Sequence, residues 1–414
     1  MSTAPTVLVL NCGSSSVKYR LLEPATGRVL AGGLVERIGA DDAEVRHRRP
    51  AGSDGEGSAE VDDRWTGPVA DHTAALDAVL DRFARLGPSL ADAGLVAVGH
   101  RVVQGGDRFL DPVVLDDDAV KAIDDLAVLA PLHNGAHAEG IRVARAVLPD
   151  VPHVAVFDTA FHATIPAHAH TYAVPQRWRT EYAVRRYGFH GSSHAYVSRE
   201  TARFLGRELA DTKTVVLHLG NGASACAVDG GRSVDTSMGL TPLQGLVMGT
   251  RSGDIDPAIS GHLARVAGMD AGAVDAALNK QSGMLALAGV SDMREVVERA
   301  EAGDVDAELA LDVYCYRVRT YVGAYLAAMG GLDAIAFTAG VGENSVPVRA
   351  RSLAGLERLG IAVDPARNAA RGSGTRLISP DGAPVAVLVV PTDEEREIAT
   401  RALAVVQPSG AAQP

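Results

Sequence analysis

The sequence predicts an α/β fold made of two duplicated lobes, because one pattern of strands and polar turns occurs twice. An apolar run, a turn of glycine and small polar residues, and a second apolar run follow one another at 6–22 and again at 213–228. The opening half of the pattern occurs a third time, at 334–344. Short glycine turns recur by chance, but two hairpins of one design roughly 200 residues apart favour a duplicated fold in which each half brings one polar turn to a central cleft.

The composition is that of a globular chain. It has 414 residues, of which 47% are hydrophobic, and a mean hydropathy of +0.07. A chain of this length can bury a sizeable core and is expected to divide into two domains. It contains no apolar run of about 18 residues and begins without the basic and apolar regions of a secretory signal, so we expect a cytoplasmic protein with no membrane partner.

The formal charge is −12, from 51 acidic and 39 basic side chains. This balance gives no general attraction for nucleic acid, so an anionic ligand must be bound locally. The three cysteines are Cys12, Cys226 and Cys315. Because they are odd in number and far apart, and because no Cys/His cluster has zinc-finger spacing, we expect neither disulfides nor structural zinc.

The first hairpin has a polar tip. The apolar run Thr6–Leu10 leads into the turn 11–16, which holds an amide and three serine hydroxyls, and Lys18 follows in the returning run. Backbone N–H groups, hydroxyls and an ammonium in one small volume suit a nucleotide phosphate and its Mg²⁺. No lysine follows a glycine, so the tip is not a Walker loop. A plain hairpin with a serine-rich turn fits this segment equally well.

The chain between the hairpins reads as alternating helices and strands. The charged, glycine-rich residues 40–68 predict an exposed excursion between strands. Apolar spacing predicts an amphipathic helix over 71–86 with Asp71 near its N-cap. A helical stretch at about 116–148 lies between two short strands, Val96–Val98 and Val154–Phe157, and the second strand ends on Asp158. Ligand groups gather at the carboxyl ends of strands in such folds.

Apolar residues at helical spacing continue over 314–329. They predict a core helix ahead of the alternative, a helix at an interface between two copies of the chain. Near the end, Thr392 and Glu395 have the Thr-x-x-Glu spacing of a capping box that would begin the last helix.

Polar clusters occur at many predicted strand ends, and together they indicate an active site. At this point the chain closely resembles the acetate kinase family. The matching strings, in the family's order from Val7 to Arg396, are LVLNCGSSSVKY, GHRVVQGG, APLHN, FDTAFH, RYGFHGSSH, HLGNGAS, DTSMGLTPL, MGTRSGDIDP, FTAGVGENS and PTDEER. They span nearly the whole chain and are specific as a set.

The resemblance implies the fold of the acetate and sugar kinase, Hsp70 and actin superfamily, with ATP in a cleft between two lobes. It implies the reaction ATP + acetate ⇌ ADP + acetyl phosphate, Mg²⁺ (with Mn²⁺ as a substitute) as cofactor, and a homodimer joined through the second lobe. We expect residues 1–158 with 396–414 to form the lobe on the acetate and phosphate side, and 159–395 to form the nucleotide-binding lobe.

The resemblance also implies roles for single residues. Asn11 and Glu394 match magnesium positions. Arg101 matches a contact to the carboxylate or its phosphate, Asp158 the position usually called the proton donor or acceptor, and His190 and Arg251 the stabilisers of the transition state. The small apolar pocket for the acetate methyl matches Val103, Leu132, Phe189 and Pro242. The nucleotide-binding set is Ser14, Ser16, Lys18, His218, Leu219, Gly220, Asn221, Gly222, Asp292, Met293, Arg294, Gly340, Val341, Gly342, Glu343 and Asn344.

Physical chemistry makes these roles reasonable. Phosphoryl transfer depends on alignment and on cancelling negative charge, which two arginines, a histidine and Mg²⁺ can supply, and Arg101 and Arg251 carry the largest expected effects. Acetate is already an anion at neutral pH, so no general base is needed in the forward direction. We therefore hypothesise that Asp158 orients Arg101 or a magnesium-bound water. By itself, a strand-end aspartate is more often a turn or N-cap residue.

Three alternative functions stay open. A kinase for a longer acid such as propionate would use the same groups, because one methylene is worth only about 1–3 kcal/mol in an apolar pocket. An ATP-driven partner-binding protein like Hsp70 would need a long peptide-binding extension, which is not expected because the chain ends about 18 residues after Arg396. A sugar kinase would use Asp158 as a true base for a hydroxyl, but its pocket would need many more hydrogen-bond partners.

Overall fold

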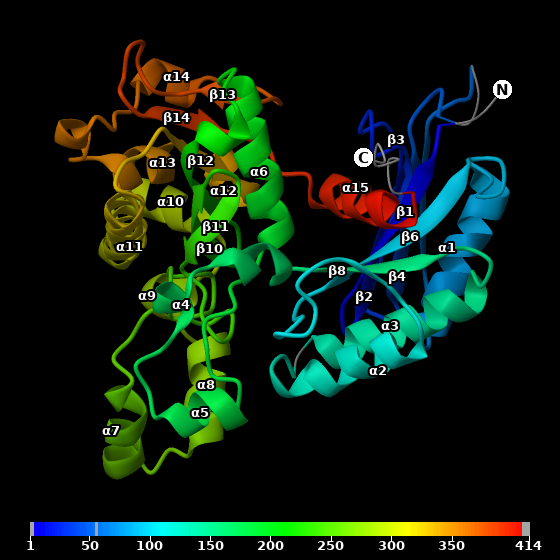
Figure 1. The fold of residues 1–414 in the computed structure, drawn as a ribbon, viewed down its shortest axis with the longest axis horizontal. Coiled ribbons are helices and arrows are strands. Elements are labelled where there is room, and N and C mark those ends of the chain that lie inside the picture. Colours follow the sequence, from blue (N-terminus) through cyan, green and yellow to red (C-terminus); the bar gives the residue numbers. More distant parts are fainter. Residues whose placement is uncertain (1–3, 54–56, 132, 408–414) are drawn as a thin grey trace, which may run out of the picture. The chain divides into compact units, whose positions relative to one another are not determined.

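A computed structural model describes residues 4–53, 57–131 and 133–407 (Figure 1). The chain divides into two compact units. The N-terminal unit comprises 1–160 and 393–414, and the C-terminal unit comprises 161–392. The chain thus passes between the units after Ala160 and after Thr392, close to the expected boundaries at 158 and 395.

The N-terminal unit is built on one mixed sheet. In pairing order its described strands are β5 (Val61–Gly67), β4 (Ala43–Arg49), β3 (Val29–Glu36), β2 (Ser16–Leu22), β1 (Thr6–Cys12), β6 (Leu95–Val102), β8 (His153–Phe157) and β7 (Val113–Val114). Its helices are α1 (His72–Leu86), α2 (Asp117–Asp125), the single turn η1 (Leu126–Val128), α3 (Asn134–Val147) and the C-terminal α15 (Glu394–Val406). One face of the sheet packs on α1 and α3, and β1, β6 and β8 also pack on α15.

The C-terminal unit holds the second sheet. In pairing order its described strands are β11 (Arg232–Thr236), β10 (Ala223–Asp229), β9 (Lys213–Leu219), β12 (Ala334–Thr338), β14 (Ala386–Val389) and β13 (Arg376–Leu377). Its helices are η2 (Ala160–Thr164), which begins at the boundary, α4 (Ala167–His170), α5 (Gln176–Glu181), α6 (Gly191–Phe204), η3 (Leu209–Asp211), α7 (Ala258–Ala267), α8 (Ala271–Lys280), α9 (Gly283–Ala288), α10 (Met293–Glu301), α11 (Val305–Met329), α12 (Ala339–Asn344), α13 (Val346–Leu353), η4 (Glu357–Leu359) and α14 (Pro365–Ala369).

The two sheets share one topology, which confirms the predicted duplication. The order β3-β2-β1-β6-β8-β7 in the first sheet corresponds to β11-β10-β9-β12-β14-β13 in the second. In each, the hairpin strands pair antiparallel, the next two pairings are parallel, and a short antiparallel strand closes the edge. Both predicted hairpins are therefore the same part of a repeated unit.

The prediction of an exposed excursion at 40–68 is wrong. Residues in this range form β4 and β5, which extend the first sheet. The side chains of β4 alternate between buried and more exposed. Nδ1 of buried His47 is hydrogen-bonded to the Tyr19 hydroxyl, 2.8 Å away. Charged residues occupy the more exposed positions of β4 and also the buried position of Arg49, so their abundance concealed the period of two that marks a strand.

The helices predicted at 71–86 and 314–329 are confirmed, and the helical stretch predicted at about 116–148 is divided among α2, η1 and α3. The Asp71 carboxylate accepts a hydrogen bond from Ala74 N at 2.9 Å and caps α1. Buried residues such as Tyr314, Val318 and Val322 make α11 a core helix.

The capping box at Thr392 is wrong. Asp393 caps α15 by accepting from Arg396 N at 3.1 Å, whereas the Thr392 hydroxyl lies 2.9 Å from Ser193 Oγ. Both residues are good caps, and the structure uses Asp393, one position later.

No helix in the described ranges combines the length and the apolar character that a membrane crossing requires.

Candidate active site

A charged cluster lies on the face of the first sheet that packs against α15. Val7 and Val9 of β1 belong to an apolar cluster with Ile398 and Ala402 of α15. Because alternate side chains of a strand share a face, Asn11 follows Val7 and Val9 on this face, at the carboxyl end of β1. The apolar contact thus positions the polar residue beyond it.

Neighbouring strands repeat this arrangement. Asp158 follows Val154 and Val156, which belong to the same apolar cluster. Arg101 follows Gly99, where a Cβ would lie 3.0 Å from Ile398 Cγ2, so Gly99 allows α15 to approach closely. On β2, Lys18 is the cross-strand partner of Asn11. The sheet therefore brings together four of the predicted residues, as expected for strand ends.

Arg101 and Asp158 form the central ion pair of this cluster. Arg101 Nε donates to Asp158 Oδ1 at 3.1 Å, and Nη2 donates to Oδ2 at 2.7 Å. The Asp158 side chain is only 1% exposed. Glu394 Oε2 lies 3.7 Å from Arg101 Nη2. Burial lowers the pKa of Arg101, but Asp158 and Glu394 outweigh it and raise the pKa above its usual value, so Arg101 stays charged.

The first turn of α15 supplies further acidic groups. Glu395 forms an ion pair with Lys18, and Asp393 Oδ1 accepts from Arg20 Nη1 at 2.9 Å. Burial raises the pKa of Glu395, but Arg20 and Lys18 outweigh it and hold the pKa below its usual value. Lys18 is therefore already paired within the N-terminal unit, and its side chain is still half exposed.

The donor set at Asn11 and Glu394 fits Mg²⁺. Both side chains carry oxygen donors and are partly exposed, on the sheet face and at the start of the helix that packs on it. Across 4–53, 57–131 and 133–407, no three His, Cys, Asp or Glu side chains gather as a metal cluster. Mg²⁺ does not require one, because it is often held by one or two carboxylates with water and substrate phosphate oxygens.

A histidine cluster lies in the C-terminal unit where α6 begins beside β9 and β10. His190 has a left-handed backbone, with φ of 57°, and precedes α6. Its Nδ1 lies 2.9 Å from Ser224 Oγ, which is also 2.7 Å from His194 Nε2. The ring of His190 stacks on that of His218, with centroids 4.2 Å apart. The turn between β9 and β10 thus holds the predicted His190 and His218 together.

Arg251 lies at the same turn. A Cβ on Gly222 would be 3.6 Å from Arg251 Nη1 and 3.7 Å from His190 Nε2. Nη1 also donates to the Pro242 carbonyl at 3.3 Å. In the described part of the chain, no carboxylate forms an ion pair with Arg251. Burial lowers its pKa, but a guanidinium remains protonated at neutral pH.

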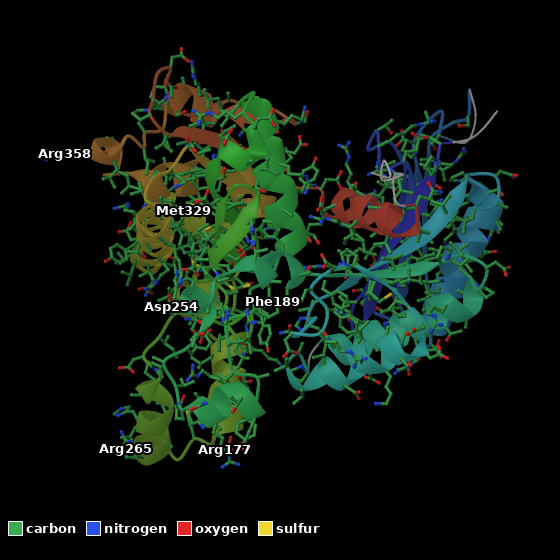
Figure 2. All side chains as sticks on the ribbon, viewed as in Figure 1. Arg177, Phe189, Asp254, Arg265, Met329 and Arg358 are labelled. Carbon is green, nitrogen blue, oxygen red and sulfur yellow. The ribbon has the colours of Figure 1, made fainter. Side chains whose placement is uncertain are left out.

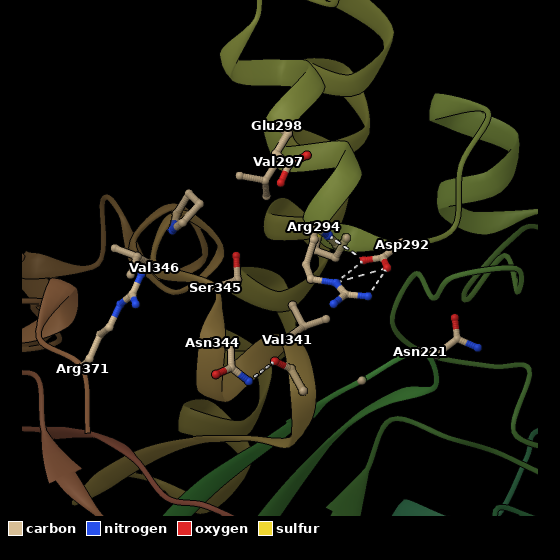
Figure 3. A pocket seen from close by; sticks show the side chains of 14 residues that line it. Asn221, Asp292, Arg294, Val297, Glu298, Val341, Asn344, Ser345, Val346 and Arg371 are labelled. Atoms are coloured by element: carbon tan, nitrogen blue, oxygen red, sulfur yellow. Dashed lines mark hydrogen bonds and ion pairs between the residues drawn. The ribbon is translucent and has the colours of Figure 1, made fainter. Parts of the chain in front are cut away.

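A pocket of about 820 Å³ opens in the C-terminal unit (Figure 3). Figure 3 shows Asn221 on one side, Asp292 and Arg294 near the start of α10, and Val341 and Asn344 of α12 below them. The Arg294 and Asp292 side chains form an ion pair that holds the pKa of Asp292 at about 2. The lining is formed by Gly220, Asn221, Asp292, Met293, Arg294, Val297, Glu298, Gly340, Val341, Asn344, Ser345, Val346, Pro347 and Arg371.

Eight of the predicted nucleotide-binding residues line this pocket, namely Gly220, Asn221, Asp292, Met293, Arg294, Gly340, Val341 and Asn344. The other predicted residues do not line it. Glu343 Oε1 accepts from Ala339 N at 2.9 Å and from Thr392 N at 3.2 Å, which fixes the start of α12. Leu219 is fully buried in β9. Ser14 and Ser16 belong to the N-terminal unit.

Sequence reasoning missed the lining from α10, α13 and the segment after α14, including Val297, Pro347 and Arg371. No motif includes these residues: Val297 and Pro347 lie three positions after the predicted Arg294 and Asn344, and Arg371 comes from a segment distant in sequence. Of the predicted methyl pocket, Val103 follows β6 in the N-terminal unit, while Phe189 and Pro242 belong to the C-terminal unit. Leu132 lies outside the described residues.

The chain is similar to known proteins along nearly its whole length. A model of the acetokinase family matches residues 6–400. Acetate kinase of Clavibacter michiganensis subsp. michiganensis is 57% identical over 402 residues, which cover 97% of this chain and 99% of that protein. The crystal structure of Porphyromonas gingivalis acetate kinase has a TM-score of 0.90 at 40% identity and covers 98% of this chain and 100% of its own.

A propionate kinase is similar as well. Its crystal structure, from Francisella tularensis subsp. tularensis, has a TM-score of 0.86 at 38% identity and covers 96% of this chain and 98% of its own. These likenesses agree with the duplicated sheets and identify the α/β fold as that of the acetate and sugar kinase, Hsp70 and actin superfamily. The family match over residues 6–400 and the identity over almost the whole length show that the chain belongs to the acetokinase family.

Proposed function

We propose that this chain transfers the γ-phosphoryl group of ATP to acetate, forming acetyl phosphate and ADP, and catalyses the reverse reaction. The observation that carries the proposal is Arg101, a charged guanidinium held by buried Asp158 at the carboxyl edge of the first sheet. An arginine fixed in this way suits a carboxylate or phosphoryl group, which it can bind through two N–H donors. The 57% identity to an acetate kinase supports acetate as the acceptor.

In the reaction a carboxylate oxygen of acetate forms a bond to the γ-phosphorus, and the bond from that phosphorus to the bridging oxygen of ADP breaks. ADP leaves with the electron pair. Arg101, Arg251 and His190 donate to the oxygens on which negative charge is carried, and no proton needs to be removed from acetate. Asn11 and Glu394 would hold Mg²⁺, which neutralises phosphate charge when bound.

Asp158 is best explained as a positioning residue. Both of its oxygens accept from Arg101, at 3.1 and 2.7 Å, and the side chain is almost fully buried. These contacts support the hypothesis that Asp158 orients Arg101 instead of moving a proton, because a base must reach the proton that it takes.

The pocket beside α10 and α12 suits the nucleotide. Its volume, about 820 Å³, falls within the range of roughly 300–1,000 Å³ that small-ligand pockets occupy. Apolar Val341, Val346 and Met293 can contact a base, and Asn344 and Arg294 provide polar groups. We therefore assign ATP to this pocket.

Replacing Gly340 by leucine is expected to raise KM for ATP at least about tenfold with little change in kcat, because it removes binding that ground and transition states share. Gly340 lines the pocket, and among the described residues outside the adjoining backbone of α12 no atom lies within 4 Å of the position of a Cβ, so the new side chain is expected to meet the ligand. Initial rates against ATP concentration measure the effect. Gly323→Leu on α11, at an equally open position away from the pocket, is the control, and equal KM values for the two variants would contradict the assignment.

The function itself is tested by trapping acyl phosphate with hydroxylamine in the presence of ATP and Mg²⁺. Acetate, propionate, butyrate and glycerol are compared with a sample that lacks an acceptor. We expect hydroxamate from acetate with kcat/KM at least about tenfold above propionate, which corresponds to about 1.4 kcal/mol of discrimination. Release of ADP without any hydroxamate would exclude a carboxylate kinase.

Propionate is the second candidate acceptor. The likeness to the Francisella propionate kinase favours it, at 38% identity and a TM-score of 0.86. One methylene changes binding by only about 1–3 kcal/mol, so both acids fit the same charged groups. Hydroxamate formed mainly from propionate in the same assay would assign this function.

The family resemblance also supports a cytoplasmic homodimer joined through the C-terminal unit. In that unit α7 buries none of its side chains, and Ile259 and Val266 on it are exposed. Exposed apolar side chains on such a helix are a suitable surface for a second copy.

A further inference from the structure

We infer that Ser224 and His194 are positioning residues that keep the ring proton of His190 on Nε2, so that His190 presents an N–H donor at the β9–β10 turn. The transferring phosphoryl group is the acceptor of this donor, an assignment that rests on the proposed function. The location of the proton follows from the hydrogen bonds together with the burial of His194.

The Ser224 hydroxyl joins two histidine rings. Its Oγ lies 2.9 Å from His190 Nδ1 and 2.7 Å from His194 Nε2, and the side chain is fully buried. In the part of the chain that the structure describes, this hydroxyl has no third partner. A hydroxyl has one proton and two lone pairs, so it could accept from both rings only by leaving its own buried proton without an acceptor. Donating to one ring and accepting from the other avoids that cost. The direction of this short relay therefore decides which nitrogen of His190 carries the proton.

His194 sets the direction. Burial, together with His162 and His218, holds the pKa of His194 well below its usual value, so the ring is neutral and has one proton. Among the described residues, its Nδ1 has no hydrogen-bond partner. A proton there would be a buried donor without an acceptor, which costs about 1–3 kcal/mol and is rarer than an unused acceptor. The proton of His194 is therefore on Nε2, from which it is donated to Ser224.

The proton donated by His194 determines the tautomer of His190. Ser224 accepts from His194 and donates to His190 Nδ1, so the proton of a neutral His190 is on Nε2. Nε2 lies beside the Gly222 turn, where a Cβ would be 3.7 Å from it and 3.6 Å from Arg251 Nη1. Two N–H donors, one from His190 and one from Arg251, thus lie at one glycine turn. Pre-positioned donors of this kind stabilise charge on phosphoryl oxygens.

The proton positions are measured by ¹⁵N NMR of the full-length enzyme labelled in its histidine rings, at a pH where His190 is neutral. Signals of His190 are identified by their absence from His190→Ala. We expect the shift of an unprotonated nitrogen for His190 Nδ1 and that of a protonated nitrogen for His190 Nε2 and His194 Nε2. A protonated Nδ1 in either ring overturns the inference.

Kinetics provide the second test. Ser224→Ala removes the hydrogen bond to His190 Nδ1, so both neutral tautomers of His190 are populated. The ¹⁵N shift of each ring nitrogen is then an average over the two tautomers. We expect kcat to fall at least about tenfold while KM for ATP changes less than about threefold, since the lost donor acts in the transition state. Ser198→Ala is the matched control, because the Ser198 hydroxyl is also buried, on the same helix as His194, and donates only to the Ala195 carbonyl.

Equal kcat values for Ser224→Ala and Ser198→Ala would overturn the positioning role. If the wild-type enzyme forms no acyl phosphate, the proposed function fails, whereas the NMR shifts still decide where the two protons lie. The two failures are therefore distinguishable.

Discussion

Replacing Arg101 by alanine is expected to lower kcat/KM for acetate by roughly 10³–10⁵, the effect of losing an arginine that cancels transition-state charge. Arg101 is held in place by two hydrogen bonds from its guanidinium to Asp158 and is 3.7 Å from Glu394. Steady-state kinetics against acetate measure the loss. Arg142→Ala, which removes an exposed partner of Asp124 in the same unit, is the control and should retain activity.

The double variant with Asp158→Asn tests how Asp158 acts. If Asp158 serves only to orient Arg101, then Asp158→Asn lowers activity in the wild type but has no further effect in Arg101→Ala. A further multiplicative loss of activity in the double variant would show that Asp158 acts on the reaction independently.

Arg251→Ala is expected to lower kcat by roughly 10³–10⁵ with a small change in KM for ATP. Within the described ranges no carboxylate pairs with Arg251, so its charge is not neutralised inside the C-terminal unit, and it lies with His190 at the Gly222 turn. Arg251→Lys should recover only part of the loss, because an ammonium cannot bind two oxygens in one plane.

Arg358→Ala is the control for this arginine. Arg358 is an exposed arginine on η4 in the same unit (Figure 2) and does not line the pocket. A kcat for Arg251→Ala within about threefold of that for Arg358→Ala would contradict the assigned role, because a charge acting on the phosphoryl group must change kcat.

The fold was predictable where apolar strands with few charges were joined by turns of glycine and small polar residues. The hairpins at 6–22 and 213–228 showed the duplication because both consist of buried strands with few charges. β4 was not predictable in the same way, because charged side chains occupy its more exposed positions and also the buried position of Arg49, which hides the alternation. The start of α15 was missed by one position because Thr392 and Asp393 are both good caps, and tertiary contacts select Asp393.

The candidate site was predictable to the extent that it follows strand ends. The alternation of side chains along each strand places Val9, Gly99 and Val156 against α15. The same alternation places Asn11, Arg101 and Asp158, two positions later, on that face. The relay from His194 through Ser224 was not predictable, because its members come from a helix and a strand 30 residues apart, and no spacing rule relates a serine of one to the other. The pocket residues Val297, Pro347 and Arg371 were also missed, because no motif includes them.

The central claim, that the phosphoryl group of ATP is transferred to a carboxylate oxygen of acetate, is tested by ³¹P NMR of the reaction with acetate labelled with ¹⁸O in its carboxyl group. The isotope shifts the signal of a phosphorus bonded to ¹⁸O. We expect acetyl phosphate in a 1:1 ratio with ADP and with the labelled oxygen bonded to phosphorus, because that oxygen forms the new bond. Inorganic phosphate in place of acetyl phosphate, or acetyl phosphate whose bridging oxygen is unlabelled, would contradict the account.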